Sequence, residues 1–225
     1  MKKITDIVRV DEMAIAQQGN LKDYGEFLTT YKKSAVNDFM TYIGDVKIST
    51  LSFYKLELFQ IKNRKLNQPD FLLGYWTIEE VDTKVGIEQK DVFRAIWAVQ
   101  ISKRELKGYK NVINIDGVFT DEDISFARKG ISTYMYQYLV NEMHYTILGD
   151  MEQYFGARKL WVGLSKIHSM QVDVIDISTN DVIIKDAILV HGEKDEEFDK
   201  RLWDTEESDS YIAKNYRCIL TKINL

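Results

Sequence analysis

The fold of this chain is decided by residues 113–164, which read INIDGVFTDEDISFARKGISTYMYQYLVNEMHYTILGDMEQYFGARKLWVGL. An apolar run at 113–119 predicts a strand, and a polar loop separates it from a helix that begins near Gly130. Apolar residues spaced by three or four predict one buried face of that helix, made up of Ile131, Tyr134, Met135, Tyr138 and Leu139. A short strand at 145–148 and a second helix at about 152–164 follow, so we expect the order strand, loop, helix, strand, helix.

The loop before the first helix has the character of an anion site. It ends in Ala127, Arg128, Lys129, Gly130, Ile131 and Ser132. The first NH groups of a helix have no intrahelical partner and carry the positive end of its dipole. Gly130 in the first turn therefore leaves room for a phosphate. Close packing of the helix start is the other explanation for this glycine.

The composition limits where in the cell the protein is expected to act. The longest apolar runs are about five residues, far below the roughly 18–20 residues that span a bilayer. Residues 1–10 lack the apolar core of a signal peptide. The one cysteine, Cys218, cannot form an internal disulfide, which fits a reducing compartment. We therefore expect a cytoplasmic protein that does not enter a membrane.

The net charge of −5 is unevenly distributed. Residues 193–209 hold nine acids and three bases, a local balance of −6, so the rest of the chain is near +1. The sequence shows no basic face of the kind that neutralises phosphates, which argues against a nucleic-acid partner. The acidic segment is either a solvated loop or, through Phe198 and Trp203, a docking segment for a basic protein.

The remaining chain predicts an antiparallel sheet, because apolar and polar residues alternate or form short apolar runs between turns. The predicted strands are 4–10, 53–61, 71–80, 92–101, 112–119, 172–177, 182–190 and 216–223. The region between the first strand and Gly44 reads as mixed helix and loop. Gly117 lies inside the strand 112–119, where a glycine often marks a bulge or the close approach of a ligand.

This order of elements, together with two motifs, resembles the GCN5-related N-acetyltransferases, and within them the divergent acetyltransferase-like proteins common in bacteriophage genomes. The resemblance covers residues 112–177. The family's pyrophosphate loop is written Q/R-x-x-G-x-G/A; here Gly130 matches, Ser132 is small, and Ala127 replaces Gln or Arg. The second motif comprises Asp150, Gln153, Gly156, Leu160 and Trp161.

The resemblance implies an α+β fold, a mixed and mostly antiparallel sheet flanked by helices, of the acyl-CoA N-acyltransferase type. It implies a single domain over residues 1–225. Within that domain it implies an acceptor-side half at 1–110, an acyl-CoA-binding core at 111–177, and C-terminal strands at 178–225 with an acidic insertion at 193–209.

The resemblance also implies acetyl-CoA as acyl donor and an amine of a small molecule or a protein as acceptor, meeting in a ternary complex. The residues that it assigns to the cofactor are Val118, Phe119, Arg128, Lys129, Gly130, Ile131 and Ser132. Tyr154 is the expected acid for the leaving sulfur, and Asp116 the expected acceptor of the amine proton through water. A core role for Tyr154 and a solvent-facing Asp116 are the alternatives, and Asp150 suits a helix N-cap.

Other chemistries find little support. His144, His168 and His191 have no partner at metal-ligand spacing, so we expect no metal site. Neither a Walker loop nor a GxGxxG motif is present.

A non-catalytic phage protein is the alternative function. It would keep the acetyltransferase scaffold as an interaction module, as an inhibitor of a host factor or defence, or as a virion-associated protein. Ala127 and the acidic loop at 120–126 favour it, since acids near a pyrophosphate repel it. If phage-encoded, either protein acts in the host cytoplasm. The sequence leaves the oligomeric state open.

Overall fold

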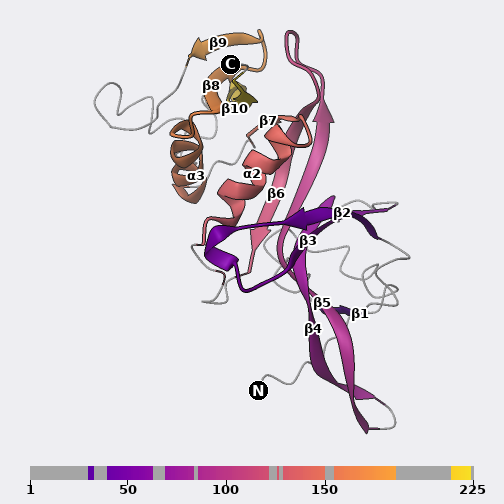
Figure 1. The fold of residues 1–225 in the computed structure, drawn as a ribbon. Coiled ribbons are helices and arrows are strands. Elements are labelled where there is room, and N and C mark those ends of the chain that lie inside the picture. Colours follow the sequence, from indigo (N-terminus) through magenta and orange to yellow (C-terminus); the bar gives the residue numbers. More distant parts are fainter. Residues whose placement is uncertain are drawn as a thin grey trace. The chain divides into compact units, whose positions relative to one another are not determined.

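A computed structural model describes residues 30–32, 40–62, 69–83, 86–121, 126, 129–149, 155–185 and 214–223. The chain divides into two compact units: unit 1 is Met1–Gln100 with Gly117–Ile131, and unit 2 is Ile101–Asp116 with Ser132–Leu225. Two of the three boundaries fall inside strands, β5 (Gly86–Arg104) and β6 (Val112–Thr120) (Figure 1), and the third lies between Ile131 and Ser132. The expectation of a single domain stays a prediction.

The described strands belong to one ten-stranded sheet, in the order β2-β3-β4-β5-β6-β7-β10-β8-β9, with β1 paired to β5. The strands of unit 1 that lie before β5 are antiparallel to their neighbours. They are β1 (Thr30–Lys32), β2 (Met40–Val46), β3 (Leu56–Ile61) and β4 (Phe71–Thr83). A short 3-10 helix, η3 (Ser49–Leu51), links β2 to β3.

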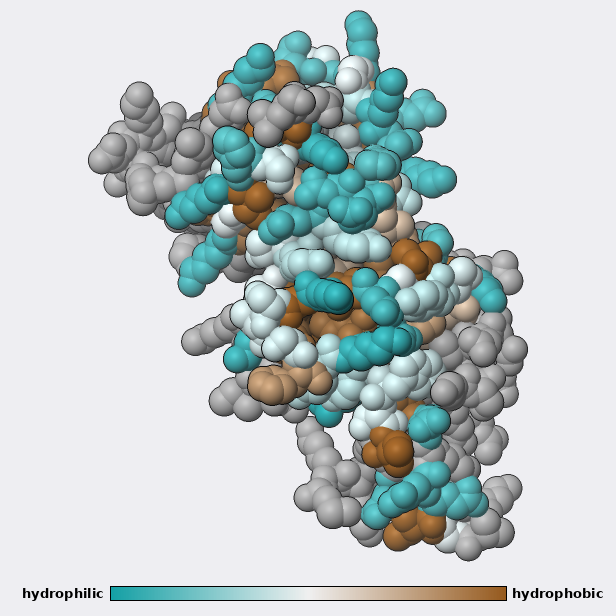
Figure 2. Space-filling model, viewed as in Figure 1, coloured by the Kyte–Doolittle hydropathy of each residue, from teal (hydrophilic) through white to brown (hydrophobic). Residues whose placement is uncertain are grey.

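The longest hairpin of unit 1 is formed by β4 and β5, which pair from Phe71↔Val99 to Thr83↔Gly86. Its base is buried, because β3 pairs with β4 as far as Tyr75. Beyond Thr77, where the pairing of β1 with Val92–Arg94 of β5 ends, the described hairpin continues as a two-stranded ribbon, on which Ile78 and Ile87 are 67% and 66% exposed. Figure 2 shows hydrophobic patches that interrupt the hydrophilic surface of this ribbon.

Unit 2 combines four strands with two helices. The elements are α2 (Ile131–Asn141, whose first residue belongs to unit 1), β7 (Thr146–Leu148), α3 (Phe155–Ser165), β8 (Met170–Asp176), β9 (Asp181–Ile184) and β10 (Tyr216–Lys222). β7 is parallel to β6 and antiparallel to β10, which in turn is antiparallel to β8. α3 lies against β8. Trp161 and Leu164 of α3 are buried, and the Trp161 ring meets that of Tyr136 edge-on at 6.1 Å.

The predicted order of elements from 112 to 185 is confirmed. Both helices and the strands β6, β7, β8 and β10 lie within a few residues of their predicted positions. The strand predicted at 182–190 is shorter, since β9 ends at Ile184 and is followed by a turn at Lys185; residues 186–190 lie outside the described residues. The buried face of α2 is rotated slightly from the predicted one, since Tyr136 and Val140 are buried while Tyr134 and Tyr138 are only half-buried.

The prediction of mixed helix and loop before Gly44 is wrong where the structure describes that region. Residues 30–32 and 40–46 are strands. The pairing of β2 with β3 shifts register between Tyr42 and Gly44, so the apolar and polar residues of β2 do not alternate cleanly. That irregularity hid the strand. The strand expected at 4–10 lies outside the described residues.

The predicted fold class is wrong as well. An α+β sheet flanked by helices, of the acyl-CoA N-acyltransferase type, was expected. Instead the described chain is about 55% strand and 18% helix. Its two α-helices have 11 residues each, about 16 Å in length, which is too little to flank a ten-stranded sheet. Residues 81–83 and 86–91 add to the strand content, because they continue the hairpin of β4 and β5 beyond the predicted strands 71–80 and 92–101.

Candidate functional site

The candidate site begins where the parallel strands β6 and β7 stop pairing. α2 connects them, and their register is Val112↔Thr146, Ile113↔Ile147 and Asn114↔Leu148. β6 then continues to Thr120, whereas β7 ends at Leu148. The next residue, Gly149, donates its N–H to the carbonyl of Cys218 on β10, at 2.8 Å. Residues 115–120 of β6 therefore extend past the last residue paired with β7.

Asp116 is held in place at this point in unit 2. Its Oδ1 accepts hydrogen bonds from the Ser102 hydroxyl at 2.9 Å and from Asn114 Nδ2 at 2.7 Å. Asn114 precedes Asp116 by two residues, so both side chains lie on one face of β6, and Asn114 is only 9% exposed. A carboxylate fixed by two donors at the end of a parallel strand pair can accept a proton or bind a cation.

The start of α2 has the geometry of an open helix terminus. Gly130 immediately precedes the helix with a φ of +73°, and a Cβ placed on it would meet nothing within 4 Å. The glycine is therefore required by its left-handed backbone and not by close packing. Ile131 is buried and anchors the first turn, while Ser132 is half-buried. The Thr50 hydroxyl donates to the carbonyl of Lys129 at 2.8 Å and supports the loop from unit 1.

The predicted cofactor residues fall mainly into one unit. Val118, Phe119, Lys129, Gly130 and Ile131 all belong to unit 1. Val118 lies in the part of β6 that extends past β7 and is 41% exposed, and Phe119 beside it is half-buried.

The other predicted site residues fall in unit 2 or outside the described residues. Asp116 and Ser132 belong to unit 2. Four further residues lie outside the described residues: Arg128, the predicted acid Tyr154, Ala127 of the pyrophosphate motif and the N-cap candidate Asp150. Their predicted roles stay predictions.

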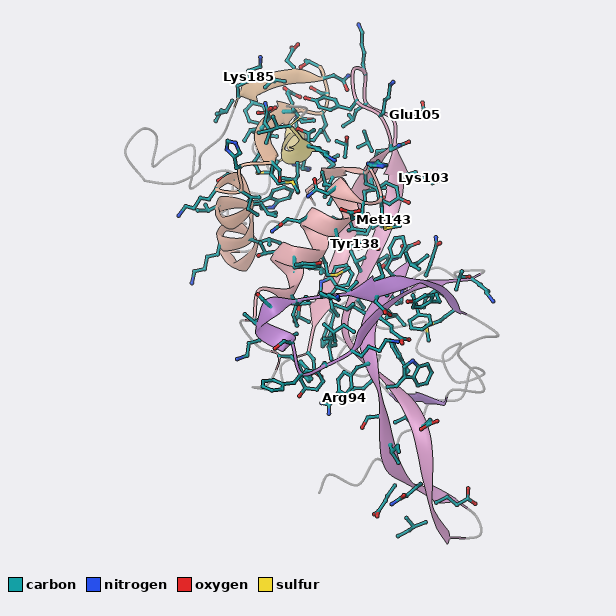
Figure 3. The ribbon with its side chains drawn as sticks, viewed as in Figure 1. Arg94, Lys103, Glu105, Tyr138, Met143 and Lys185 are labelled. Carbon is teal, nitrogen blue, oxygen red and sulfur yellow. The ribbon has the colours of Figure 1, made fainter. Side chains whose placement is uncertain are left out.

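The acidic loop after β6 is partly neutralised in unit 1. Asp121 pairs with Arg94 at 3.3 Å, with the two side chains 18% and 33% exposed respectively. The Arg94 guanidinium, labelled in Figure 3, also lies over the ring of Phe126 at 5.7 Å from its centroid. The repulsion expected from Asp121 toward a pyrophosphate is therefore offset by a neighbouring cation.

Three residues that support the site were missed from the sequence. Asn114 could have been predicted, because it is a polar residue in an apolar strand and lies two positions before Asp116, on the same face of the strand. Ser102 and Arg94 carried none, since their role depends on how β5 lies beside the chain at 116–121.

Among the described residues, no group of three or more histidine, cysteine, aspartate or glutamate side chains could hold a metal ion. No helix in the described part of the chain is long and apolar enough to cross a membrane. Comparison of the chain with family models, curated proteins and solved structures finds no match.

Proposed function

We propose that the chain is an acetyl-CoA-dependent N-acetyltransferase acting on an amine of a small molecule or of a protein. The observation that carries the proposal is the extension of β6 past β7, followed in sequence by the open start of α2. A strand that extends past the end of its neighbour can hydrogen-bond the amide groups of a pantetheine arm, as an added strand would. A helix start with a glycine before it can bind a pyrophosphate.

The proposed reaction is a single transfer in a ternary complex. The amine nitrogen attacks the thioester carbon, a C–N bond forms, and the C–S bond to coenzyme A breaks. Asp116 takes the proton lost by the amine, directly or through water, and Tyr154 supplies a proton to the leaving thiolate. The backbone of Val118 and Phe119 aligns the acyl arm, and residues 128–132 bind the pyrophosphate.

The chemistry of Cys218 supports direct transfer over a covalent acyl-enzyme. It is the single cysteine of the chain, and its side chain in β10 is fully buried. Burial raises the pKa of the Cys218 thiol above its ordinary value, and a thiol is nucleophilic only as the thiolate. A covalent acyl-enzyme would therefore require nucleophilic attack by the Cys218 thiol, which is neither ionised nor accessible.

The experiment is a thermal-shift titration with acetyl-CoA, because a ligand that binds the folded state raises its melting temperature with concentration. Two matched variants locate the site: Gly130→Asn and Gly130→Asp have nearly the same shape, and both residue types tolerate a left-handed backbone. We expect the asparagine variant to keep the shift and the aspartate variant to lose it through charge repulsion. No shift in the native protein at millimolar ligand contradicts the function; equal shifts in both variants contradict the pyrophosphate assignment.

A second candidate is the non-catalytic interaction module, which the ribbon of β4 and β5 favours. Ile78 and Ile87 are exposed on the same face of that ribbon, since Ile78 pairs with Asp91 and Ile87 with Asp82. An isolated two-stranded hairpin is marginally stable in water, and a docked partner would stabilise it. Substituting both isoleucines by threonine should abolish such binding and leave acetyl-CoA binding unchanged. The docking role expected for residues 193–209 concerns residues that the structure does not describe, and it stays a prediction, as does a cytoplasmic location.

A further inference from the structure

The edge strand β9 has an unusual sequence for an exposed edge. Among the described strands β9 is the last in the sheet order, paired on one side with β8 (Figure 1). It carries three aliphatic residues in a row, and Val182 and Ile183 are 39% and 41% exposed. An edge strand with exposed aliphatic side chains is a template for pairing with another strand. Natural edges are usually protected by charge, proline or a bulge. The central residues of β9 carry neither charge nor proline, and the pairing of β9 with β8 shifts register at Ile183, between the residues that pair with Val174 and Ile175.

The charges that flank β9 are of opposite sign. Asp181 begins the strand and Lys185 directly follows it, both exposed, and Lys185 is labelled beside β9 in Figure 3. Among the described residues neither side chain forms an ion pair.

We propose that β9 is a homodimerisation strand, which pairs antiparallel with β9 of a second copy about a two-fold axis at Ile183. The sequence Asp-Val-Ile-Ile-Lys at 181–185 is complementary to itself in this register. Asp181 lies opposite Lys185 of the second copy, Val182 opposite Ile184, and Ile183 opposite Ile183. The two ends therefore form opposite-charge pairs, and the centre forms aliphatic pairs. A closed two-fold contact of this kind uses the same patch on both copies.

The distribution of charge along residues 181–185 disfavours parallel pairing of two β9 strands. Parallel pairing of two β9 strands would place Asp181 against Asp181 and Lys185 against Lys185, which is unfavourable at both ends. A five-residue strand pair alone buries less than the roughly 1,200 Å² typical of stable complexes. The dimer should therefore form reversibly, and its population should rise with protein concentration.

The first test is sedimentation velocity of the full chain between about 1 μM and 1 mM. We expect the mass to rise from monomer toward dimer over this range, with less association at high salt because exposed charges are screened. Asp181→Lys should weaken association roughly tenfold, since both end pairs become repulsive. The charge-swapped variant with Asp181→Lys and Lys185→Asp should restore it. A monomer mass at every concentration, or a swap that fails to restore association, overturns the proposal.

The second test reads the register directly by disulfide cross-linking. Directly opposed residues of antiparallel strands have Cα atoms about 4.5–5.5 Å apart, which suits a disulfide. Ile183→Cys should therefore cross-link with itself under mild oxidation. Val182→Cys should cross-link only when mixed with Ile184→Cys. The native Cys218 is fully buried and serves as an inert background. Equal cross-linking of Val182→Cys and Ile183→Cys alone would contradict the register, and thermal unfolding of each variant checks that it is folded.

Discussion

The hairpin of β4 and β5 and the pair of β6 and β7 use strands in opposite ways. In the hairpin, 13 residues of β4 find partners along β5 through a short local connection. In the parallel pair, only Val112–Asn114 of β6 meets β7, and the crossover runs through α2. The hairpin therefore exposes mainly side chains, whereas the parallel pair leaves a strand end, a fixed carboxylate and a helix start. Ligands of open α/β sheets bind at the carboxyl ends of parallel strands, which is why we propose β6 and α2 as the site of the chemistry.

The largest effect should come from removing the carboxylate of β6. Asp116→Asn keeps the shape of the side chain but removes the proton acceptor, so acetyl transfer should slow by about 10²–10⁴-fold. Thiol release from acetyl-CoA measures the rate, and a thermal shift checks that the cofactor still binds. Asp91→Asn makes the same chemical change on the ribbon of β4 and β5, where Asp91 is exposed, and should leave the rate unchanged. Equal rates for native protein and Asp116→Asn would remove Asp116 from the mechanism.

The next largest effect should come from a substitution that disrupts the close approach of β4 and β5. A Cβ at Gly74 would lie 2.1 Å from the backbone carbonyl of Arg94 and 2.7 Å from the Phe93 ring. Because a backbone atom cannot move aside, Gly74→Ala should lower the free energy of unfolding by about 3 kcal/mol. Urea unfolding measures the change. An unchanged midpoint would mean that β4 and β5 do not approach each other as closely at this bulge as described.

The same contrast between the hairpin and the parallel pair explains how much of the fold could be predicted from the sequence. The parallel pair was predictable because each element is short and is bounded by its own signals, such as Gly130 before α2 and Gly149 after β7. The extent of the hairpin was not, because residues 81–91 are mostly polar and their few apolar residues, Val81, Val85 and Ile87, form no apolar run. Residues 81–83 and 86–91 become strand through the pairing of β4 with β5 as far as Thr83↔Gly86. Local propensity cannot report such a long-range preference.

The candidate site was predictable only in part for a related reason. Asp116 and Gly130 are visible in the sequence, since one interrupts an apolar strand and the other precedes a periodic helix. One donor to Asp116, the Ser102 hydroxyl, and the cation that pairs with Asp121 are supplied by β5. Their contribution depends on strand register, which one sequence does not reveal.

A smaller effect concerns the buried thiol of β10. Burial raises the pKa of Cys218 in the folded state above its ordinary value of 9.0. The unfolded chain therefore releases this proton first, and the stability present below pH 9.0 is lost as the pH rises above it. We expect the free energy of unfolding to fall by about 1.4 kcal/mol per pH unit there, and Cys218→Ala to remove that slope. A slope that survives the substitution would assign it to another group.

The smallest effect is a stabilisation of α3, opposite in sign to that at Gly74. A Cβ on Gly163 would meet nothing within 4 Å, and the residue lies inside the helix Phe155–Ser165. Alanine is the better helix former, so Gly163→Ala should raise the free energy of unfolding by about 0.5–1 kcal/mol. Chemical denaturation checks the sign. A loss of stability would show that the space beside Gly163 is filled.

The most direct test of the central claim is hydrogen–deuterium exchange with and without acetyl-CoA. If the acyl arm pairs with residues 115–120 of β6 and the pyrophosphate caps α2, amides in 115–120 and 130–133 should exchange more slowly with ligand. Amides of β9 at Asp181–Ile184 should not change. Protection of both segments supports an acyl-CoA site on β6 and α2. No protection in either segment at saturating acetyl-CoA, or protection confined to other parts of the chain, would contradict it.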